Sequence, residues 1–362
     1  MVPVAACTSA PASPGATTRG TASPAITAAQ ARQVFDRYVA AAANAEWPDA
    51  ASPLLSLVTG VERAVLTATL GSHSVVVNGS SPTTQGAYSS SLSVQPGLDH
   101  YTYGTPTFYR PAAAGYPRFF VASVTRTLRG TEPANGKTAR IGGVQVPVDG
   151  PALLLFSRAR PGASWLLASA SQLPSGVTLP ELARSSAGDI PTAPLSDAAL
   201  LAQPDDTGPL QAAVVDDGPA STATRAVADG PFTTGMYQGA RNHVDGLRAP
   251  HGDVYQWELQ GSSLPEFALR TADGGALVFY AMSLDTTVAV PDVINKGNPV
   301  HPGPPIQVPA DLQALLPAGQ PTPLVQLQSQ QMLSFAAIDP APGKAKVQVI
   351  AMGGGLTAAT AS

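Results

Sequence analysis

Residues 267–283 read FALRTADGGALVFYAMS and carry the clearest folding signal in the chain. Two runs rich in β-forming residues, 267–271 and 276–283, flank Asp273-Gly274, a dipeptide typical of the two-residue turn of a β-hairpin. Just upstream, residues 255–260 alternate Tyr, Trp and Leu with Gln and Glu, which is the pattern of a strand buried on one face. These residues predict an antiparallel sheet.

The same half of the chain supplies further elements on both sides of this hairpin. We expect helical segments at 208–227 and 232–244, strands at 255–260, 267–271, 276–283, 325–337 and 344–349, a proline-rich loop at 291–309 and a short helix at 310–316. Helices therefore come first, and antiparallel strands follow them.

The first half of the chain has the same order of elements. Thr27 and Gln30 have the spacing of a capping box, and apolar residues then recur at helical spacing from Ala31 to Ala42, before Trp47-Pro48 ends the helix. After it we expect helices at 53–58 and 61–70, and strands at 99–109, 119–128, 151–158 and 164–170.

This repeated order predicts an α+β fold of two tandem domains, each with helices packed on a curved antiparallel sheet. The expected divisions are a first domain at 27–172, a linker at 173–195, a second domain at 196–355 and a tail at 356–362. Gly60 and Gly230 hold equivalent places in the two halves, between one helical segment and the next. The arrangement resembles the cone of the cystatin and nuclear-transport-factor-2 type.

The amino terminus indicates export and lipid anchoring. Val4-Ala5-Ala6-Cys7 matches the bacterial lipobox, and a Ser/Thr/Pro/Ala-rich stretch at 8–26 reads as a disordered tether. Residues 1–7 would be the remnant of a lipoprotein signal whose basic and apolar parts lie upstream of Met1. We therefore expect acylation of Cys7, with diacylglycerol and palmitate chains, and a bilayer as the partner of the acylated residue.

Composition narrows the functional classes. The net charge is −4 and no basic block is present, which argues against nucleic-acid binding. A single cysteine excludes an internal disulfide, and no apolar run is long enough for a membrane-spanning helix.

No catalytic motif appears, and we expect no cofactor and no metal site. Nucleophile elbows, zinc spacings and phosphate-binding loops are all missing from the sequence, and Gly353-Gly354-Gly355 lacks the lysine and helix that a phosphate loop needs. Asp205-Asp206 and Asp216-Asp217 could hold a hard cation and Asp273 could be a general base, but we interpret the pairs as solvated surface residues and Asp273 as a turn residue. A pocket at the open end of the first cone is a further hypothesis, to be weighed against ordinary aromatic packing; its candidate residues are Tyr38, Trp47, His100, Tyr101 and Tyr103.

Several short segments of the sequence resemble those of a family of actinobacterial exported lipoproteins of unknown function. Phe108-Tyr109-Arg110-Pro111 with Tyr116-Pro117-Arg118-Phe119-Phe120 resembles one strand pair of that family. Leu154-Leu155-Phe156-Ser157-Arg158 with Ser164-Trp165 resembles its next hairpin, and residues 268–277 resemble its second-half hairpin. The resemblance spans about residues 27 to 355 and implies the tandem fold. It supplies no catalytic residue.

Together these observations predict a non-catalytic binding or scaffolding module on the extracytoplasmic face of the cell membrane. Its partner would be a cell-envelope protein or ligand that the sequence does not name. The alternative is an enzyme, a hydrolase or isomerase that works inside one of the cones with an Asp or His base, whose groups would be scattered along the sequence.

Overall fold

The computed structural model describes residues 25–43, 51–78, 101–112, 115–128, 138–186, 188–251, 254–290, 306, 308, 310–317 and 325–362. The predictions that rest on Cys7, Trp47 and His100 lie outside these residues. The predicted tether is too long at its end, because Ala25 and Ile26 are buried and the Ala25 N–H donates to the Pro111 carbonyl oxygen at 2.9 Å. These two apolar residues belong to the folded part of the chain.

Helices form close to the predicted places. They are α1 (Ala28–Ala43), α2 (Ala51–Leu55), α3 (Gly60–Asn78), α4 (Thr207–Asp217), α5 (Thr234–His251) and α7 (Ala310–Gln313), with short 3-10 helices at Pro204–Asp206, Gly218–Ala220 and Thr222–Arg225. The capping box is confirmed: the Thr27 N–H donates to Gln30 Oε1 at 3.1 Å, and the Gln30 N–H donates to Thr27 Oγ1 at 3.2 Å. In the described part of the chain, no helix is both long and apolar enough to cross a bilayer.

Strands form in both halves of the chain. They are β1 (Tyr101–Tyr103), β2 (Thr107–Tyr109), β3 (Pro111–Ala112), β4 (Arg118–Leu128), β5 (Thr138–Ile141), β6 (Val144–Pro147), β7 (Gly150–Arg158), β8 (Leu166–Gln172), β9 (Ile190–Pro191), β10 (Val254–Gly261), β11 (Phe267–Arg270), β12 (Ala276–Ala289), β13 (Gln326–Asp339) and β14 (Gln348–Ala361). The hairpin predicted at Asp273-Gly274 is confirmed, since β11 pairs antiparallel with β12 and Gly274 has φ 92°.

The strands of both halves join one antiparallel sheet, in the order β1-β4-β7-β8-β14-β13-β12-β10, with β2 also paired to β4 and β11 to β12. Each half has the same pattern of pairing, and the last strands of the two halves, β8 and β14, lie side by side. The fold is thus mixed α and β and dominated by a large antiparallel sheet. Two separate tandem cones are not confirmed, because the sheet is continuous.

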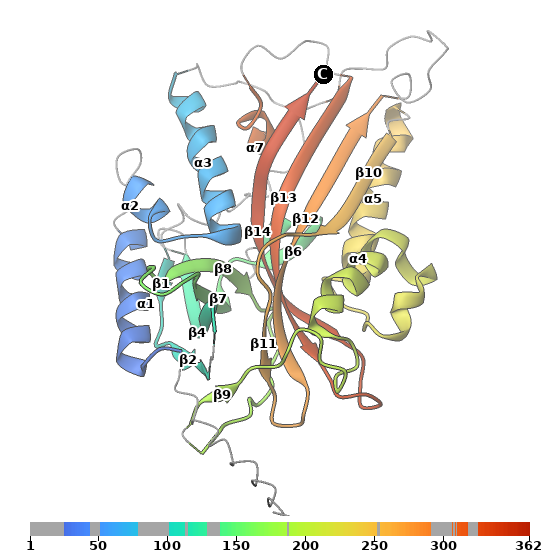
Figure 1. The fold of residues 1–362 in the computed structure, drawn as a ribbon. Helices are drawn as coiled ribbons and strands as arrows, with labels where there is room; N and C mark the ends of the chain where they lie inside the picture. The colour runs from blue at the N-terminus through green and yellow to red at the C-terminus, as the bar shows by residue number, and fades with distance from the viewer. Residues whose placement is uncertain are drawn as a thin grey trace, which may run out of the picture.

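The two halves also share a core. Helices α1 and α2 lie on one face of the first-half strands, and α4 and α5 lie on the far side of the second-half strands (Figure 1). Between these layers the two sets of strands pack face to face, with the ring centroids of Phe119 and Phe267 only 4.4 Å apart. Burial at this interface means that neither half has a complete hydrophobic core by itself.

A hairpin that the sequence did not predict ties the halves further. Strands β5 and β6 leave the first half between β4 and β7, and Ile141 and Val146 are buried in the second-half core beside Met236. The Gly142 N–H donates to Gln331 Oε1 at 3.0 Å. Gly142 has φ +56°, and a Cβ there would lie 2.9 Å from Met236 Cε, so this tight insertion favours glycine.

The segment predicted as a linker is folded against both halves. Strand β9 pairs with β3, while Leu182 and Thr192 form bridges to Thr271 and Leu269 of the second half. The residues predicted as a tail, 356–362, continue β14 as far as Ala361. Both differences arise from long-range strand pairing, which local composition does not report.

The junction of the halves is a close backbone contact between β8 and β14. Gln172 of β8 pairs with Met352 of β14. A Cβ at Gly353 would collide with the carbonyl oxygen of Ala170, and a Cβ at Gly354, where φ is +113°, would collide with that of Met332. The glycine run that follows a predicted strand is therefore part of β14, and it allows the two strands to meet.

We predict that Gly353→Ala destabilises the protein by about 1–3 kcal/mol or more, because backbone atoms cannot move aside as a flexible side chain can. Gly261→Ala is the matched control, since Gly261 is an exposed strand glycine with open space around its Cα. Urea denaturation of both variants measures the difference. Equal stability of the two variants would contradict the role assigned to Gly353.

Candidate functional site

Three of the residues predicted to line a pocket lie together in the first half. The ring centroids of Tyr38 on α1 and Tyr103 on β1 are 6.5 Å apart, and those of Tyr101 and Tyr103 are 6.2 Å apart. Trp47 and His100, the other two residues of that hypothesis, fall outside the described residues.

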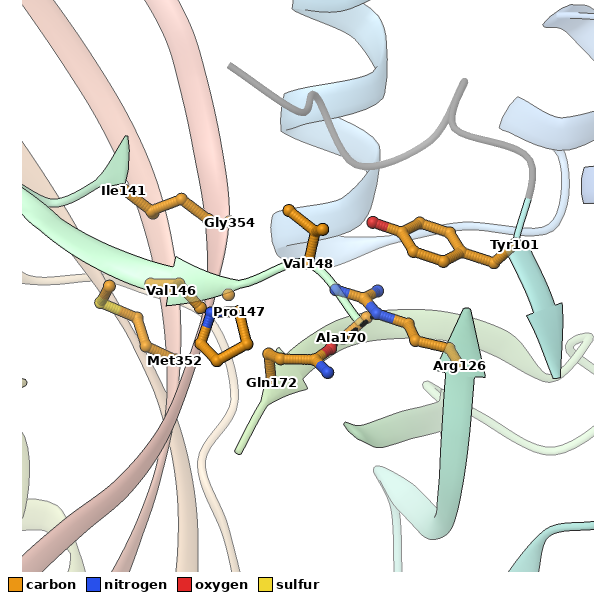
Figure 2. A pocket seen from close by; sticks show the side chains of 11 residues that line it. Tyr101, Arg126, Ile141, Val146, Pro147, Val148, Ala170, Gln172, Met352 and Gly354 are labelled. Carbon is orange, nitrogen blue, oxygen red and sulfur yellow. Dashed lines mark hydrogen bonds between the residues drawn. The ribbon is translucent and has the colours of Figure 1, made fainter. Parts of the chain in front are cut away.

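Arg126 of β4 brings a positive charge into this cluster. Its side chain is buried, and its guanidinium carbon lies 4.4 Å from the ring centroid of Tyr101. Its Nε donates to Gln172 Oε1 at 2.7 Å, the contact drawn in Figure 2. Gly150 stands opposite Arg126 in the sheet, and its φ of +120° is a backbone conformation that favours glycine.

Glu62 of α3 brings a negative charge into the same interior. It is 4% exposed, and its Oε1 accepts a hydrogen bond from the Ala170 N–H of β8 at 2.9 Å. Helix α3 therefore reaches the strand that meets β14 through a buried carboxyl group. Such a group is costly to bury unless it is hydrogen-bonded or neutral.

The electrostatic balance of the cluster is set by burial. Burial raises the pKa of Glu62 to about 7, although the positive charge of Arg126 and the hydrogen bond from Ala170 act in the opposite direction. Burial also raises the pKa of Tyr38 and of Tyr103. Burial alone would lower the pKa of Arg126, but the nearby tyrosines and Glu62 outweigh it and raise that pKa. Near neutral pH the carboxyl group of Glu62 is thus partly protonated, while Arg126 keeps its charge.

A small space lies beside this cluster, where the first half meets the second. Tyr101, Arg126 and Gln172 form its polar side, and the β5–β6 hairpin and β14 close the other side through Val146 and Met352 (Figure 2). This space is partly open, and its volume of about 10 Å³ is room for about one water molecule. Gln172 Nε2 is buried and has no hydrogen-bond partner among the residues that the structure describes, so a water molecule fits the chemistry of this space.

Two of the acidic candidates, Asp216 and Asp273, have structural roles. Asp216 Oδ1 accepts a hydrogen bond from the Leu259 N–H at 3.1 Å and so occupies a donor on the edge strand β10. Asp273 accepts from the Gly275 N–H and from the Thr271 hydroxyl, the pattern of a turn residue. Across the residues described, no three His, Cys, Asp or Glu side chains gather in a way that would hold a metal ion.

Sequence reasoning missed Glu62, Arg126 and Gln172 because they lie on three separate elements and form no motif. One signal was available for Arg126. Side chains two positions apart along a strand point to the same face, so Arg126 lies on the same face as Phe120, Ala122 and Val124. That face is buried in the core, and an arginine there needs a partner.

The raised pKa of Glu62 gives a signed prediction. Because the folded state holds this proton more tightly than the unfolded state, its contribution to stability is full below pH 4.5 and is lost as the pH rises through about 7. For a shift from 4.5 to about 7 the loss is roughly 3 kcal/mol. Glu62→Gln, which stays neutral, should remove this part of the pH dependence.

The measurement is the free energy of unfolding of the native protein and of Glu62→Gln between pH 4.5 and 8. Glu181→Gln, at an exposed position, is the control and should follow the native curve. A Glu62→Gln curve parallel to that of the native protein would show that the carboxyl group does not titrate differently on folding.

Comparison with known proteins gives a family. Neither a curated protein nor a solved structure matches the chain. A family model described as Domain of unknown function (DUF8094) matches residues 22–361. This match covers nearly the whole sequence, including both halves of the sheet and the buried cluster, and the chain therefore belongs to the DUF8094 family.

Proposed function

We propose that this protein is a lipid-anchored, exported binding or scaffolding module without catalytic activity, held on the extracytoplasmic face of the cell membrane. The anchor is acylated Cys7, and the support for it is the lipobox Val4-Ala5-Ala6-Cys7 with the polar tether behind it. The diacylglycerol and palmitate chains give a stable anchor where a single chain would not.

The proposal that the protein is not catalytic rests on one observation: the candidate site is occupied by its own side chains. Arg126 donates a hydrogen bond to Gln172 and makes a cation–π contact with Tyr101, and Glu62 accepts a hydrogen bond from the Ala170 N–H. The charged groups of the site therefore already have partners within the protein. The space beside them accommodates about one water molecule, which is too small for an organic substrate. Partners would then bind at the outer surface of the module.

The tandem interpretation is part of this proposal. The pairing of β1, β2, β4, β7 and β8 in the first half has the same pattern as that of β10 to β14 in the second. We infer that the halves are two related cones of the nuclear-transport-factor-2 type, fused through β8 and β14. Two similar modules on one anchor favour multivalent contact with a cell-envelope protein or ligand.

One observation favours the alternative of an enzyme. Glu62 has a pKa of about 7 and shares the interior with Arg126 and two tyrosines, which is the kind of arrangement that acid–base catalysis uses. The base would then be a glutamate rather than an aspartate or histidine. In this alternative the hairpin β5–β6 would have to move to admit a substrate.

The anchor is tested by expressing the gene with its own upstream DNA in a bacterium that processes lipoproteins. We expect the native protein in the membrane fraction with a diacylglycerol-modified and palmitoylated Cys7, identified by mass spectrometry. Cys7→Ser should leave the membrane fraction, and Ser9→Ala, as the control, should stay. An unmodified Cys7 in the membrane fraction contradicts the anchor.

The non-catalytic assignment is tested with ester and cell-wall substrates. The purified protein and Glu62→Gln should show the same background rate on each substrate, because no group of the cluster meets substrate. Turnover that Glu62→Gln abolishes, with unchanged folding by circular dichroism, would establish the enzyme instead.

A further inference from the structure

Two arginines face each other at one end of the first-half sheet. Arg118 begins β4 and Arg158 ends β7, and the register places them directly opposite each other. Both lie on the sheet face that also carries Phe120 and Phe156, so their side chains leave the sheet in the same direction. Like charges in directly opposite positions destabilise a sheet unless something compensates them.

Neither arginine has a carboxylate partner in the described part of the chain. The Nε atoms of Arg118 and Arg158 are both buried and without a hydrogen bond. The ion pairs among the described residues are Arg32–Asp36 and Arg270–Asp197, so no carboxylate pairs with either group. Both side chains are half-buried as a whole, and the buried, unused groups are their Nε donors, which usually have a hydrogen-bond partner when they are shielded from water.

The surroundings hold these groups in place rather than neutralise them. The guanidinium carbon of Arg118 lies 4.9 Å from the ring centroid of Tyr116, a cation–π contact that fixes its position. A third arginine, Arg37 of α1, donates to the Trp165 carbonyl oxygen at 3.2 Å. Trp165 directly precedes β8, next to the strand end that carries Arg158, so Arg37 adds positive charge at the same end of the sheet.

We propose that Arg118 and Arg158 form a binding site for a doubly charged oxyanion of the phosphate type. Guanidinium groups bind phosphate with two parallel hydrogen bonds, and two such groups match a dianion in charge. The anion would accept hydrogen bonds from the unpartnered Nε–H groups of Arg118 and Arg158, and its negative charge would offset the repulsion between the two guanidinium groups. This inference does not depend on the lipid anchor or on the absence of catalysis.

The probe is inorganic phosphate, added to the full-length chain, with sodium chloride at equal ionic strength as the reference. The melting temperature of the native protein should rise with phosphate and saturate. In Arg158→Gln and in Arg118→Gln the apparent Kd for phosphate should increase at least tenfold, because charge-assisted hydrogen bonds are lost. Arg241→Gln, at an exposed arginine of α5, is the control and should bind as the native protein does.

Folding of the variants is not expected to fail, since each removes one of two opposed charges. Arg158→Lys gives a second readout. It keeps the positive charge but loses the paired N–H donors of the guanidinium group, so phosphate binding should weaken. The melting temperature in chloride should stay unchanged. The same phosphate response in native protein, Arg118→Gln and Arg158→Gln would overturn the site. A native response no greater than that to chloride would overturn it as well.

The phosphate group can come from a solute or from a lipid headgroup, and flotation with vesicles separates the two when it is done in a Cys7→Ser background, which carries no lipid anchor. Flotation with phosphatidic acid but not with phosphatidylcholine, lost in Arg158→Gln, supports the site with a headgroup as its ligand. Binding of inorganic phosphate without any flotation supports the site with a soluble ligand.

Discussion

The whole arrangement depends on the approach of two backbones at the β8–β14 junction. Gly353 lies so close to the carbonyl oxygen of Ala170 that no other residue fits without displacing one strand, and Ser171 adds a 3.0 Å hydroxyl contact to Ser334 on β13. Because the last strands of the two halves meet here, their sheets become one, and the faces that carry no helices are brought together over the core that contains Phe119 and Phe267. A wider separation at this point would expose that core.

The junction also explains where the buried polar cluster lies. Gln172 is paired with Ala152 in the first half and with Met352 in the second, and its side chain accepts the hydrogen bond of Arg126. Glu62 holds the neighbouring N–H of Ala170. The polar groups are therefore placed at the seam between the halves, where a hydrogen-bonded network also specifies the register of the two sheets. The hairpin β5–β6 closes the same seam from the other side.

Local patterns led to most of the elements but to only part of the site. The capping box at Thr27 and the turn at Asp273-Gly274 were predictable because their hydrogen bonds join residues two to four positions apart. Tyr38, Tyr101 and Tyr103 could be grouped because aromatic residues on a predicted helix and strand have one core to fill. Glu62 and Arg126 could not be grouped, since their common environment is created by pairings more than 40 residues apart. The hairpin at 138–147 was missed for a related reason: its apolar residues find their core in the other half.

By itself the sequence determined the kind and order of most elements and the antiparallel nature of the sheet, because each of these is encoded in neighbouring residues. Only the tertiary structure decided that two expected domains share one sheet and one core, that the predicted linker and tail are strands or bridges, and that Arg118 faces Arg158. These features depend on which strand lies beside which, and that choice is made by burial and backbone pairing over the whole chain rather than by any local pattern.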